Sequence, residues 1–339
     1  MFDYAMDLGT SSVLLYRQGK GIVLQEPSVL AVQRKNGQVI CAGTKARELF
    51  GRTPEALLSV RPIRGGVITD CEMTGIMTKA MLKKAGGSKF VRPNLLICVP
   101  PLVSELEERA VIDAGMQAGA SRVYLMEQPV AAAVGAGIDP KNPKGTLIAD
   151  IGAGTTDIAV LSMGAVVRAV SVRIAGDSWD DAICGYVRQK HDLDIGLSTA
   201  ETIKCTIGGV LPKEEEQSMC VRGRSSSAGL PACIQLSSNE LIPLFRQQVG
   251  QIALAIEQLL EHIPPDLVGD LTETGLLLCG GGSHLYGIDT CLEQQLGLQV
   301  HIAEQPECCV VQGASKLLGG LHRREDGTIH LARRRQGIL

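Results

Sequence analysis

Two aspartates in this sequence each stand where an apolar run meets a turn of small residues. Asp150 lies in LIADIGAGTTDIAVL (147–161), and Asp7 lies in YAMDLGTSSVLLY (4–16). Glycines let backbone N–H groups approach a ligand closely, and small side chains leave room for a phosphate group. A carboxylate beside such a turn can hold a cation or a water next to the phosphate. Each stretch therefore predicts a strand, a phosphate-binding turn and a second strand.

The two stretches continue alike, because each runs into a glycine turn and another strand. These continuations read QGKGIV (18–23) and MGAVV (163–167). A repeat this far apart indicates two domains of similar plan. Two hairpins that face each other would clamp a nucleotide polyphosphate and its metal from both sides.

Composition narrows the functional classes. The chain has 339 residues, enough for two sizeable domains, of which 45% are hydrophobic and 20% charged. Aromatic residues make up 3% and the net charge is −3, which argues against nucleic acid as a partner. We expect no signal peptide and no membrane span, so that any membrane contact is peripheral.

Cysteine usage indicates the redox environment. The sequence has 11 cysteines, an odd number, without C-x-x-C spacing. Most lie in apolar runs, as Cys98, Cys184 and Cys279 do. We therefore expect reduced core residues in a cytosolic protein, and packing rather than redox chemistry for the adjacent Cys308 and Cys309.

Periodicity and turn signals predict the elements that position the two turns. Ser104 and Glu107 predict a capping box, and Asp177 a helix cap. A glycine run, 280–283, follows a third strand and precedes a helix, so it can approach an adenine ring or a phosphate, although a tight strand–helix turn explains it as well. Helices are expected at 44–50, 71–85, 104–118, 130–136, 177–190, 239–262, from 285, and at 308–321, and strands at 94–99, 123–126, 146–151, 157–162, 165–174, 275–279 and 298–302.

With these pieces in order, the chain resembles the actin, heat-shock ATPase and sugar kinase superfamily, and within it the bacterial actin MreB family. The resemblance covers residues 3–320. It rests on DLGTSS (7–12), GKGIVLQEPSVLAV (19–32), GRTPEALLSVRPIRGGVITD (51–70), CVPPLVSELEERAV (98–111), EQPVAAAVGAG (127–137), DIGAGTTDIAV (150–160), AGDSWDDAI (175–183), AETIK (200–204), VRGR (221–224) and LCGGGSHLYGID (278–289).

This resemblance implies an α/β protein with the actin-like ATPase fold. Two similar βββαβα domains would each carry a smaller inserted subdomain, with the nucleotide in the cleft between them. The expected boundaries are 1–30 plus 61–140 for the first large subdomain, joined by helix 308–321, then 31–60 for its insert, 141–190 plus 244–307 for the second large subdomain, 191–243 for its insert, and 322–339 for a basic tail.

The resemblance also implies the site. ATP and Mg2+ would be the ligands, and the chain would be a slow ATPase coupled to polymerisation. Residues Asp7 and Asp150 would hold Mg2+ through water. Nucleotide contacts would come from Thr10, Ser11, Ser12, Gly152, Ala153, Gly154, Glu201, Thr202, Ile203, Lys204, Gly280, Gly281, Gly282 and Ser283.

Two departures from the family pattern bear on hydrolysis. Ala153 replaces the middle glycine of the second turn, which costs little if its φ is negative. Gln128 stands where the family usually has a glutamate that positions the attacking water. A glutamine can orient water but cannot act as a base, so hydrolysis is expected to be slow. Glu127 is the other candidate catalytic residue, although its side chain should sit one position off.

The family further implies filaments beneath the cell membrane that guide cell-wall synthesis in rod-shaped bacteria. The expected partners are the chain itself, in antiparallel paired protofilaments, the inner membrane surface and the cell-wall elongation machinery. Phe90 and Val91, flanked by Lys89 and Arg92, would suit a weak interfacial anchor. A loop packed on its own domain is the alternative, and the arginine-rich tail is either solvated or a second membrane contact.

Three other functions stay open from the sequence. Gln128 allows a nucleotide-gated scaffold with little or no hydrolysis. A chaperone-type ATPase would need a further substrate domain of a couple of hundred residues. A sugar kinase would need a sugar pocket and a catalytic aspartate, for which the sequence gives no signal.

Overall fold

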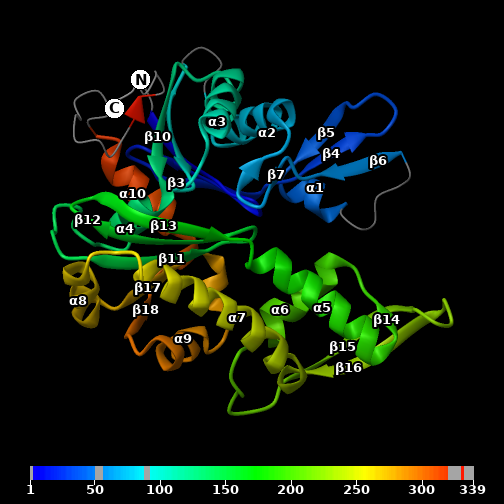
Figure 1. Cartoon of the computed structure of the whole chain (residues 1–339). Coiled ribbons are helices and arrows are strands. Elements are labelled where there is room, and N and C mark those ends of the chain that lie inside the picture. The colour runs from blue at the N-terminus through cyan, green and yellow to red at the C-terminus, as the bar shows by residue number, and fades with distance from the viewer. Residues whose placement is uncertain (1–2, 50–55, 88–91, 320–329, 332–339) are drawn as a thin grey trace.

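The protein is described here from a computed structural model that covers residues 3–49, 56–87, 92–319 and 330–331. Two large β-sheets form its centre, and a smaller sheet with its own helix extends from each (Figure 1). Helices that pack against these sheets belong to three main clusters of buried apolar residues. The predicted α/β architecture is confirmed.

The first large sheet is built around the strand that carries Asp7. This strand, β1, runs antiparallel to β2 and parallel to β9, so the sheet is mixed. Every residue of β9 is buried, as the apolar run LLICV predicts for a central strand. In spatial order the sheet contains β19 (His330–Leu331), β10 (Arg122–Glu127), β9 (Asn94–Val99), β1 (Asp3–Leu8), β2 (Ser12–Arg17) and β3 (Gly21–Pro27).

The second large sheet repeats this plan around the strand that carries Asp150. Its strand β11 is antiparallel to β12 and parallel to β17, as β1 is to β2 and β9. The two predicted repeats thus have the same strand directions and the same order of neighbouring strands. In spatial order the sheet contains β13 (Ala165–Val172), β12 (Thr156–Ser162), β11 (Thr146–Ile151), β17 (Leu276–Cys279) and β18 (Val300–Ile302).

Two helices pack together between the large sheets. They are α4 (Gln128–Gly135) and α10 (Cys309–Leu317), and their buried residues share one cluster with residues of both sheets. A Cβ added at Gly313 would overlap the carbonyl of Ala131, so glycine is required for the close approach of the two helices. This contact holds the two halves of the chain against each other.

The remaining helices cover the outer faces. Trp179 of α5 and Phe245 of α7 meet edge to face at 6.1 Å between ring centroids, in the core of the second half. The helices are α2 (Cys71–Lys84), α3 (Glu105–Gln117), α5 (Gly176–His191), α7 (Ser238–Leu260), α8 (Pro265–Thr274) and α9 (Ile288–Leu296), with short 3-10 helices η1 (Gly281–His284) and η2 (Pro306–Cys308).

Two three-stranded sheets and a short hairpin complete the fold. One small sheet packs with α1 (Thr44–Glu48) and the other with α6 (Leu197–Ile207). The strands are β5 (Val39–Ala42), β4 (Leu30–Gln33) and β6 (Leu57–Val60), then β14 (Leu193–Asp194), β15 (Ser218–Ser225) and β16 (Pro231–Ser237), and the hairpin strands β7 (Ile63–Arg64) and β8 (Val67–Ile68).

Several local expectations are confirmed and others are wrong. The capping box of α3 forms between Ser104 and Glu107. Asp177 does not cap α5, because the helix already begins at Gly176. In α3 Leu106 is 76% exposed, whereas Val111 is buried. Helix α8 was not expected, since the prolines before it read as a stop, whereas Pro265 begins the helix, where its missing N–H is not needed.

The cysteine prediction is wrong for three residues. Cys220 and Cys233 are exposed and joined by a disulfide, and Cys205 is exposed as a free thiol. Isolated cysteines on alternating strand positions gave no signal of pairing. The predicted domain boundaries stay a prediction, although each small sheet lies almost entirely within one predicted insert. The membrane residues Phe90 and Val91, and the tail apart from 330–331, lie outside the described residues.

Candidate functional site

The two predicted turns have the same backbone geometry. The N–H of Gly9 donates to the carbonyl of Ser12 at 3.0 Å, and that of Gly152 donates to the carbonyl of Thr155 at 2.9 Å. Each turn thus closes the end of an antiparallel strand pair tightly. Among the described non-glycine residues only Met163 and Asp192 have positive φ, so Ala153 keeps a backbone conformation that an alanine adopts without strain.

The two turns line one cavity of about 450 Å3 between the halves. This volume falls in the range of small-molecule and cofactor sites, roughly 300–1,000 Å3. The third turn, at the start of η1, closes another side of the cavity. Predicted residues on its wall are Asp7, Thr10, Ser11, Ser12, Gln128, Asp150, Gly152, Ala153, Gly154, Glu201, Lys204, Gly280, Gly281 and Gly282.

Two of the predicted aspartates stand at the floor of this cavity. Withdrawal from water raises the pKa of Asp7 to about 6, against a smaller lowering by a hydrogen bond from Gln128. Burial, and then repulsion by Asp7 and by Asp157, raises the pKa of Asp150 well above its usual range. A pair of carboxyl groups in this position attracts a cation, which would stabilise both in their ionised form.

A third acid, Asp157, was missed by the sequence reasoning. It lies directly opposite Asp150 in the strand pair β11–β12, is 3% exposed, and accepts a hydrogen bond from the Thr155 hydroxyl at 2.9 Å. The signal was present, since strand positions on either side of a tight turn face each other. Within the described residues no group of three or more Asp, Glu, His or Cys is arranged to chelate a metal directly.

Of the two catalytic candidates, Gln128 and Glu127, only Gln128 lines the cavity. The side-chain amide of Gln128 donates to Asp7 Oδ1 at 3.4 Å, so its nitrogen faces the carboxylate and its oxygen is available to a water. Glu127, the last residue of β10, does not line the cavity, whereas Gln128, the first residue of α4, does. Gln128 is thus the member of the pair that reaches the site.

Helix α6 brings residues three and four positions apart to the cavity. Glu201 and Lys204 lie on its wall, as their three-residue spacing predicts. Lys204 pairs with Asp180 at 2.8 Å and also donates to the carbonyl of Gly176 at 2.8 Å. Thr202 and Ile203, which were also predicted as nucleotide contacts, do not line the cavity. The Thr202 hydroxyl donates to the carbonyl of Ser198, and Ile203 is buried in the core.

The third turn contributes backbone rather than side chains. Gly280 has φ +80°, and a Cβ at that position would overlap Asp150 and the carbonyl of Ile151. Ser283 does not line the cavity, because its hydroxyl is buried and donates to the carbonyl of Cys279 at 2.6 Å. Glycine is therefore required at position 280 for this turn to pack against β11, and all three glycines of the turn line the cavity.

Charged residues from both halves meet across the cavity mouth, which the sequence did not predict. Arg47 of α1 pairs with Glu201 at 2.5 Å, and Arg61 pairs with Asp177 at 3.2 Å. On the far rim Lys213 lies 5.5 Å from the ring centroid of Tyr286, and both line the cavity. These contacts join segments that are distant in the sequence, so residue spacing could not predict them.

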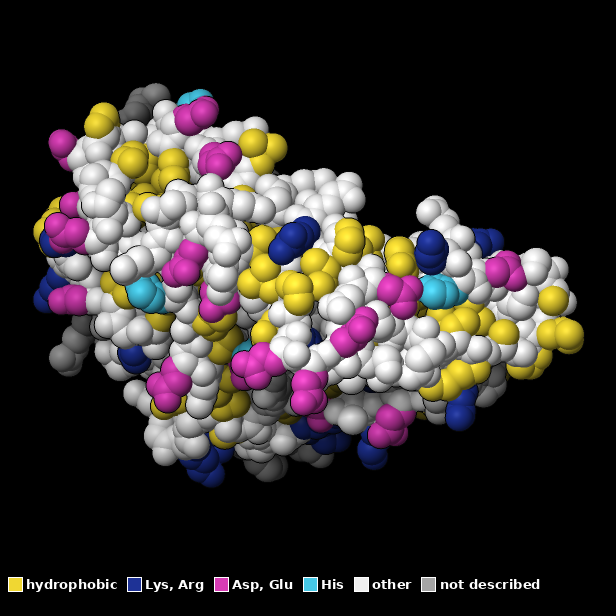
Figure 2. All heavy atoms as spheres, turned by 90° about the horizontal axis from the view of Figure 1, so that it is seen from below, with side chains coloured by type: hydrophobic (Ala, Val, Ile, Leu, Met, Phe, Trp, Pro, Cys, Tyr) yellow, Lys and Arg dark blue, Asp and Glu magenta, His cyan; other side chains and the backbone are white. Residues whose placement is uncertain are grey.

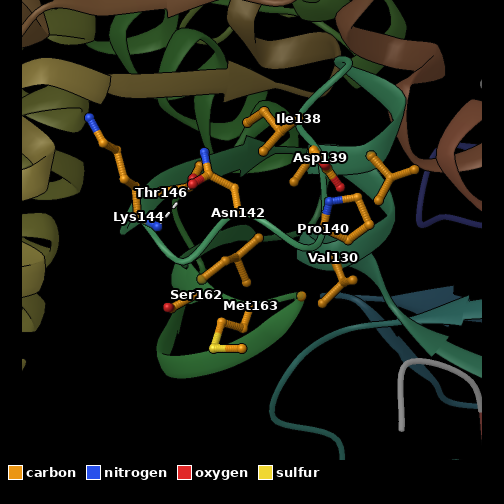
Figure 3. A pocket seen from close by; sticks show the side chains of 13 residues that line it. Val130, Ile138, Asp139, Pro140, Asn142, Lys144, Thr146, Ser162 and Met163 are labelled. Carbon is orange, nitrogen blue, oxygen red and sulfur yellow. Dashed lines mark hydrogen bonds between the residues drawn. The ribbon is translucent and has the colours of Figure 1, made fainter. Parts of the chain in front are cut away.

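A second, much smaller hollow lies beside the linker between the halves (Figure 3). It has a volume of about 20 Å3, room for little more than one water, and is enclosed by the linker around Pro140 and by the turn at Met163. The N–H of Met163 donates to the carbonyl of Asn142, and the Ser162 hydroxyl donates to that of Pro143. The hollow belongs to the junction between the halves and offers no ligand site.

No helix of the described chain is long and apolar enough to cross a membrane. Acidic and basic side chains are interspersed with apolar and uncharged ones on the face seen in Figure 2.

Two similar mixed sheets, with turns and aspartates that meet at one cavity, define the actin-like class. Solved structures agree: MreB5 of Spiroplasma citri bound to ADP has a TM-score of 0.89 and 34% identity, covering 93% of this chain and 95% of that one. A MamK double helical filament structure, at 21% identity and a TM-score of 0.79, covers 94% of this chain and 98% of that chain and shows the fold alone.

The family follows from the sequence comparisons. The family model described as MreB/Mbl protein matches residues 1–326. The cell shape-determining protein Mbl of Bacillus cereus is 41% identical, over 95% of this chain and 97% of its own length. The cell shape-determining protein MreB of Escherichia coli is 40% identical, over 93% of each chain. The chain belongs to the MreB/Mbl family.

Proposed function

We propose that this chain is an ATP-binding, filament-forming bacterial actin that organises cell-wall synthesis beneath the membrane and maintains rod shape. The observation that carries the proposal is the cavity where both glycine and hydroxyl turns meet two aspartates. The ADP-bound MreB5 of Spiroplasma citri supports it, since it shares this fold across nearly the whole chain. The similar proteins Mbl of Bacillus cereus and MreB of Escherichia coli are cell shape-determining proteins.

The chain's own groups divide the work of binding. Backbone N–H groups of both turns, with the hydroxyls of Thr10, Ser11 and Ser12, hold the phosphates. Glu201 and Lys204 reach the ribose and base from α6, and Gly280 to Gly282 lie against the adenosine. Mg2+ would be held through water by Asp7 and Asp150, and when bound it neutralises phosphate charge.

Hydrolysis depends on Gln128. Its oxygen orients a water toward the terminal phosphate while its nitrogen is tied to Asp7. An amide cannot take a proton from that water, so turnover is slow. The same residue favours a second function, a nucleotide-gated scaffold that binds ATP, assembles and hydrolyses little.

Sedimentation with ATP, ADP or no nucleotide, paired with phosphate release, tests both functions. A filament ATPase pellets and releases phosphate slowly, and a scaffold pellets without release. Gln128→Ala should lower phosphate release about tenfold while binding persists. Equal release by wild type and variant would exclude Gln128 from the reaction. A chain that stays in the supernatant and consumes ATP only with sugar would be a kinase instead.

Self-association would use the outer face of α3. Arg109 and Met116 are exposed on this helix beside Leu106. An exposed apolar residue with charged neighbours suits an isologous contact in antiparallel paired protofilaments. Arg109→Glu with Leu106→Ser should abolish pairing in electron micrographs without loss of nucleotide binding. Unchanged paired filaments would contradict the assignment.

The chain would act as a cytoplasmic protein, peripheral at the inner membrane surface, together with the cell-wall elongation machinery. A Phe-Val pair anchors weakly, so many copies in a filament are needed. The Phe90→Ser, Val91→Ser double variant should no longer pellet with anionic liposomes. Pelleting equal to wild type would exclude this anchor.

A further inference from the structure

The ribbon formed by β15 and β16 has two different faces, and it extends away from the body of the second half (Figure 1). Its inner face contributes Val221 and Leu236 to the same core cluster as α6. Its outer face exposes Cys220, Arg222 and Cys233 to solvent. The proposed nucleotide site uses none of these outer residues.

Cys220 and Cys233 lie close enough to be joined without moving the backbone. Their Cα atoms are 6.5 Å apart and their sulfurs form a disulfide. Cys220 faces Gln235 and Cys233 faces Arg222, so the bond crosses the ribbon diagonally. Bridged cysteines usually have Cα atoms roughly 4.4–6.8 Å apart, which puts this pair near the upper limit. An exposed bond of this kind is open to attack by small thiols.

The guanidinium of Arg222 adds a chemical reason for reactivity at Cys233. Residues directly opposite in an antiparallel pair have Cβ atoms roughly 4.5–5.5 Å apart. Arg224, two positions along, is paired with Asp194 at 3.3 Å, whereas Arg222 has no such carboxylate partner among the described residues. An unpaired positive charge favours the thiolate of Cys233, which is the reactive form. It also attracts an anionic reagent.

We propose that Cys220 and Cys233 form a reversible thiol–disulfide exchange site for anionic low-molecular-weight disulfides such as that of glutathione. The Cys233 thiolate attacks one sulfur of the reagent and expels one thiolate, leaving a mixed disulfide. The Cys220 thiolate then attacks Cys233 Sγ and expels the second. Two protein thiols are oxidised, the reagent is reduced to two thiols, and each expelled thiolate takes up one of the protons released.

The full chain is first reduced, freed of reductant and incubated with glutathione disulfide. Alkylation under denaturing conditions and mass spectrometry then count the thiols. The wild type should lose two thiols, with the bond mapped to Cys220 and Cys233, and regain them with reduced glutathione. Cys220→Ser should stop at the mixed disulfide on Cys233, because the resolving thiol is missing.

Two charge variants test the role of the arginine. Arg222→Gln should slow oxidation by glutathione disulfide about threefold or more, because the thiolate fraction and the attraction of the reagent both fall. Arg224→Gln is the matched control and should react within about twofold of wild type, since Asp194 already compensates that charge. Uncharged hydroxyethyl disulfide should discriminate less between the two.

Three results would overturn the proposal. They are retention of the Cys220 and Cys233 thiols by the wild type, a glutathione adduct that persists on Cys233 of the wild type, and equal rates for Arg222→Gln and Arg224→Gln. None of these results involves nucleotide or filaments, so the proposal fails or stands independently of the proposed function.

Discussion

The two turns at the cavity have the same backbone hydrogen bond but contribute different side chains. The first turn supplies three hydroxyl residues, and its Asp7 receives the amide of Gln128. The second turn supplies almost no side chain, and its Asp150 faces a further acid, Asp157. The repeat therefore sets the positions of groups around the cavity, and the divergence of the two copies sets their roles.

The contact between the turns shows why the second one needs small residues. A Cβ added at Gly154 would lie 2.6 Å from Thr10 Oγ1 and 2.9 Å from the backbone of Gly65. Thr10 Oγ1 already accepts a hydrogen bond from the N–H of Gly66 at 3.0 Å. The second turn thus packs against the first half itself, which leaves the hydroxyls of the first turn in place.

The largest expected effect is the pH dependence of the free energy of unfolding, to which both buried aspartates contribute. The folded protein binds a proton on Asp7 more tightly than the unfolded chain, because its pKa is about 6 instead of 3.8. The free energy of unfolding of the protein without Mg2+ and nucleotide should therefore fall by about 3 kcal/mol as pH rises from about 4 to about 6. Asp150, whose pKa is also raised, contributes with the same sign.

Urea unfolding between pH 4 and pH 7 measures this loss. Asp7→Asn should flatten the profile over that window, and exposed Asp266→Asn is the surface control. If Asp7→Asn kept the wild-type slope while Asp150→Asn removed it, the second turn alone would carry the buried charge.

A smaller effect is expected from the packing of the turns. Gly154→Ala should weaken nucleotide binding roughly tenfold to a hundredfold, since overpacking costs about 1–3 kcal/mol. Ala153→Gly adds flexibility without a clash and should change affinity less than about threefold. Titration with a fluorescent ATP analogue compares them. Equal affinities for the two variants would mean that the turns separate when nucleotide binds.

The smallest effect concerns the ion pair across the cavity mouth. The Arg47 and Glu201 side chains are 49% and 33% exposed, so their pair contributes about 0.2–1 kcal/mol. Arg47→Ala should speed nucleotide dissociation by up to about fivefold, as measured by stopped-flow chase. Lys45→Ala on the same helix is the matched control. Identical rates for both variants would show that this pair does not hold the halves together around the ligand.

Much of the candidate site follows from local rules. Asp7, Asp150 and their turns were predicted because an apolar run, an acid and small residues specify a tight turn wherever the segment is placed. Ile203 and Thr202 were predicted from the same segment as Glu201 but do not line the cavity. A helix turns about 100° per residue, so only the packing of α6 on its sheet decides which residues reach the cavity.

The sequence by itself determined the repeat, the strand–turn–strand units and the family, since these depend on residues near one another in the chain. Only the tertiary structure decided that Asp157 joins the two aspartates, that Arg47 meets Glu201 and that Cys220 bridges Cys233 across an exposed ribbon. Such contacts depend on the register and crossing of segments far apart, which no local pattern records. The two turns line the same cavity because the packing of α4 on α10 brings their strands together.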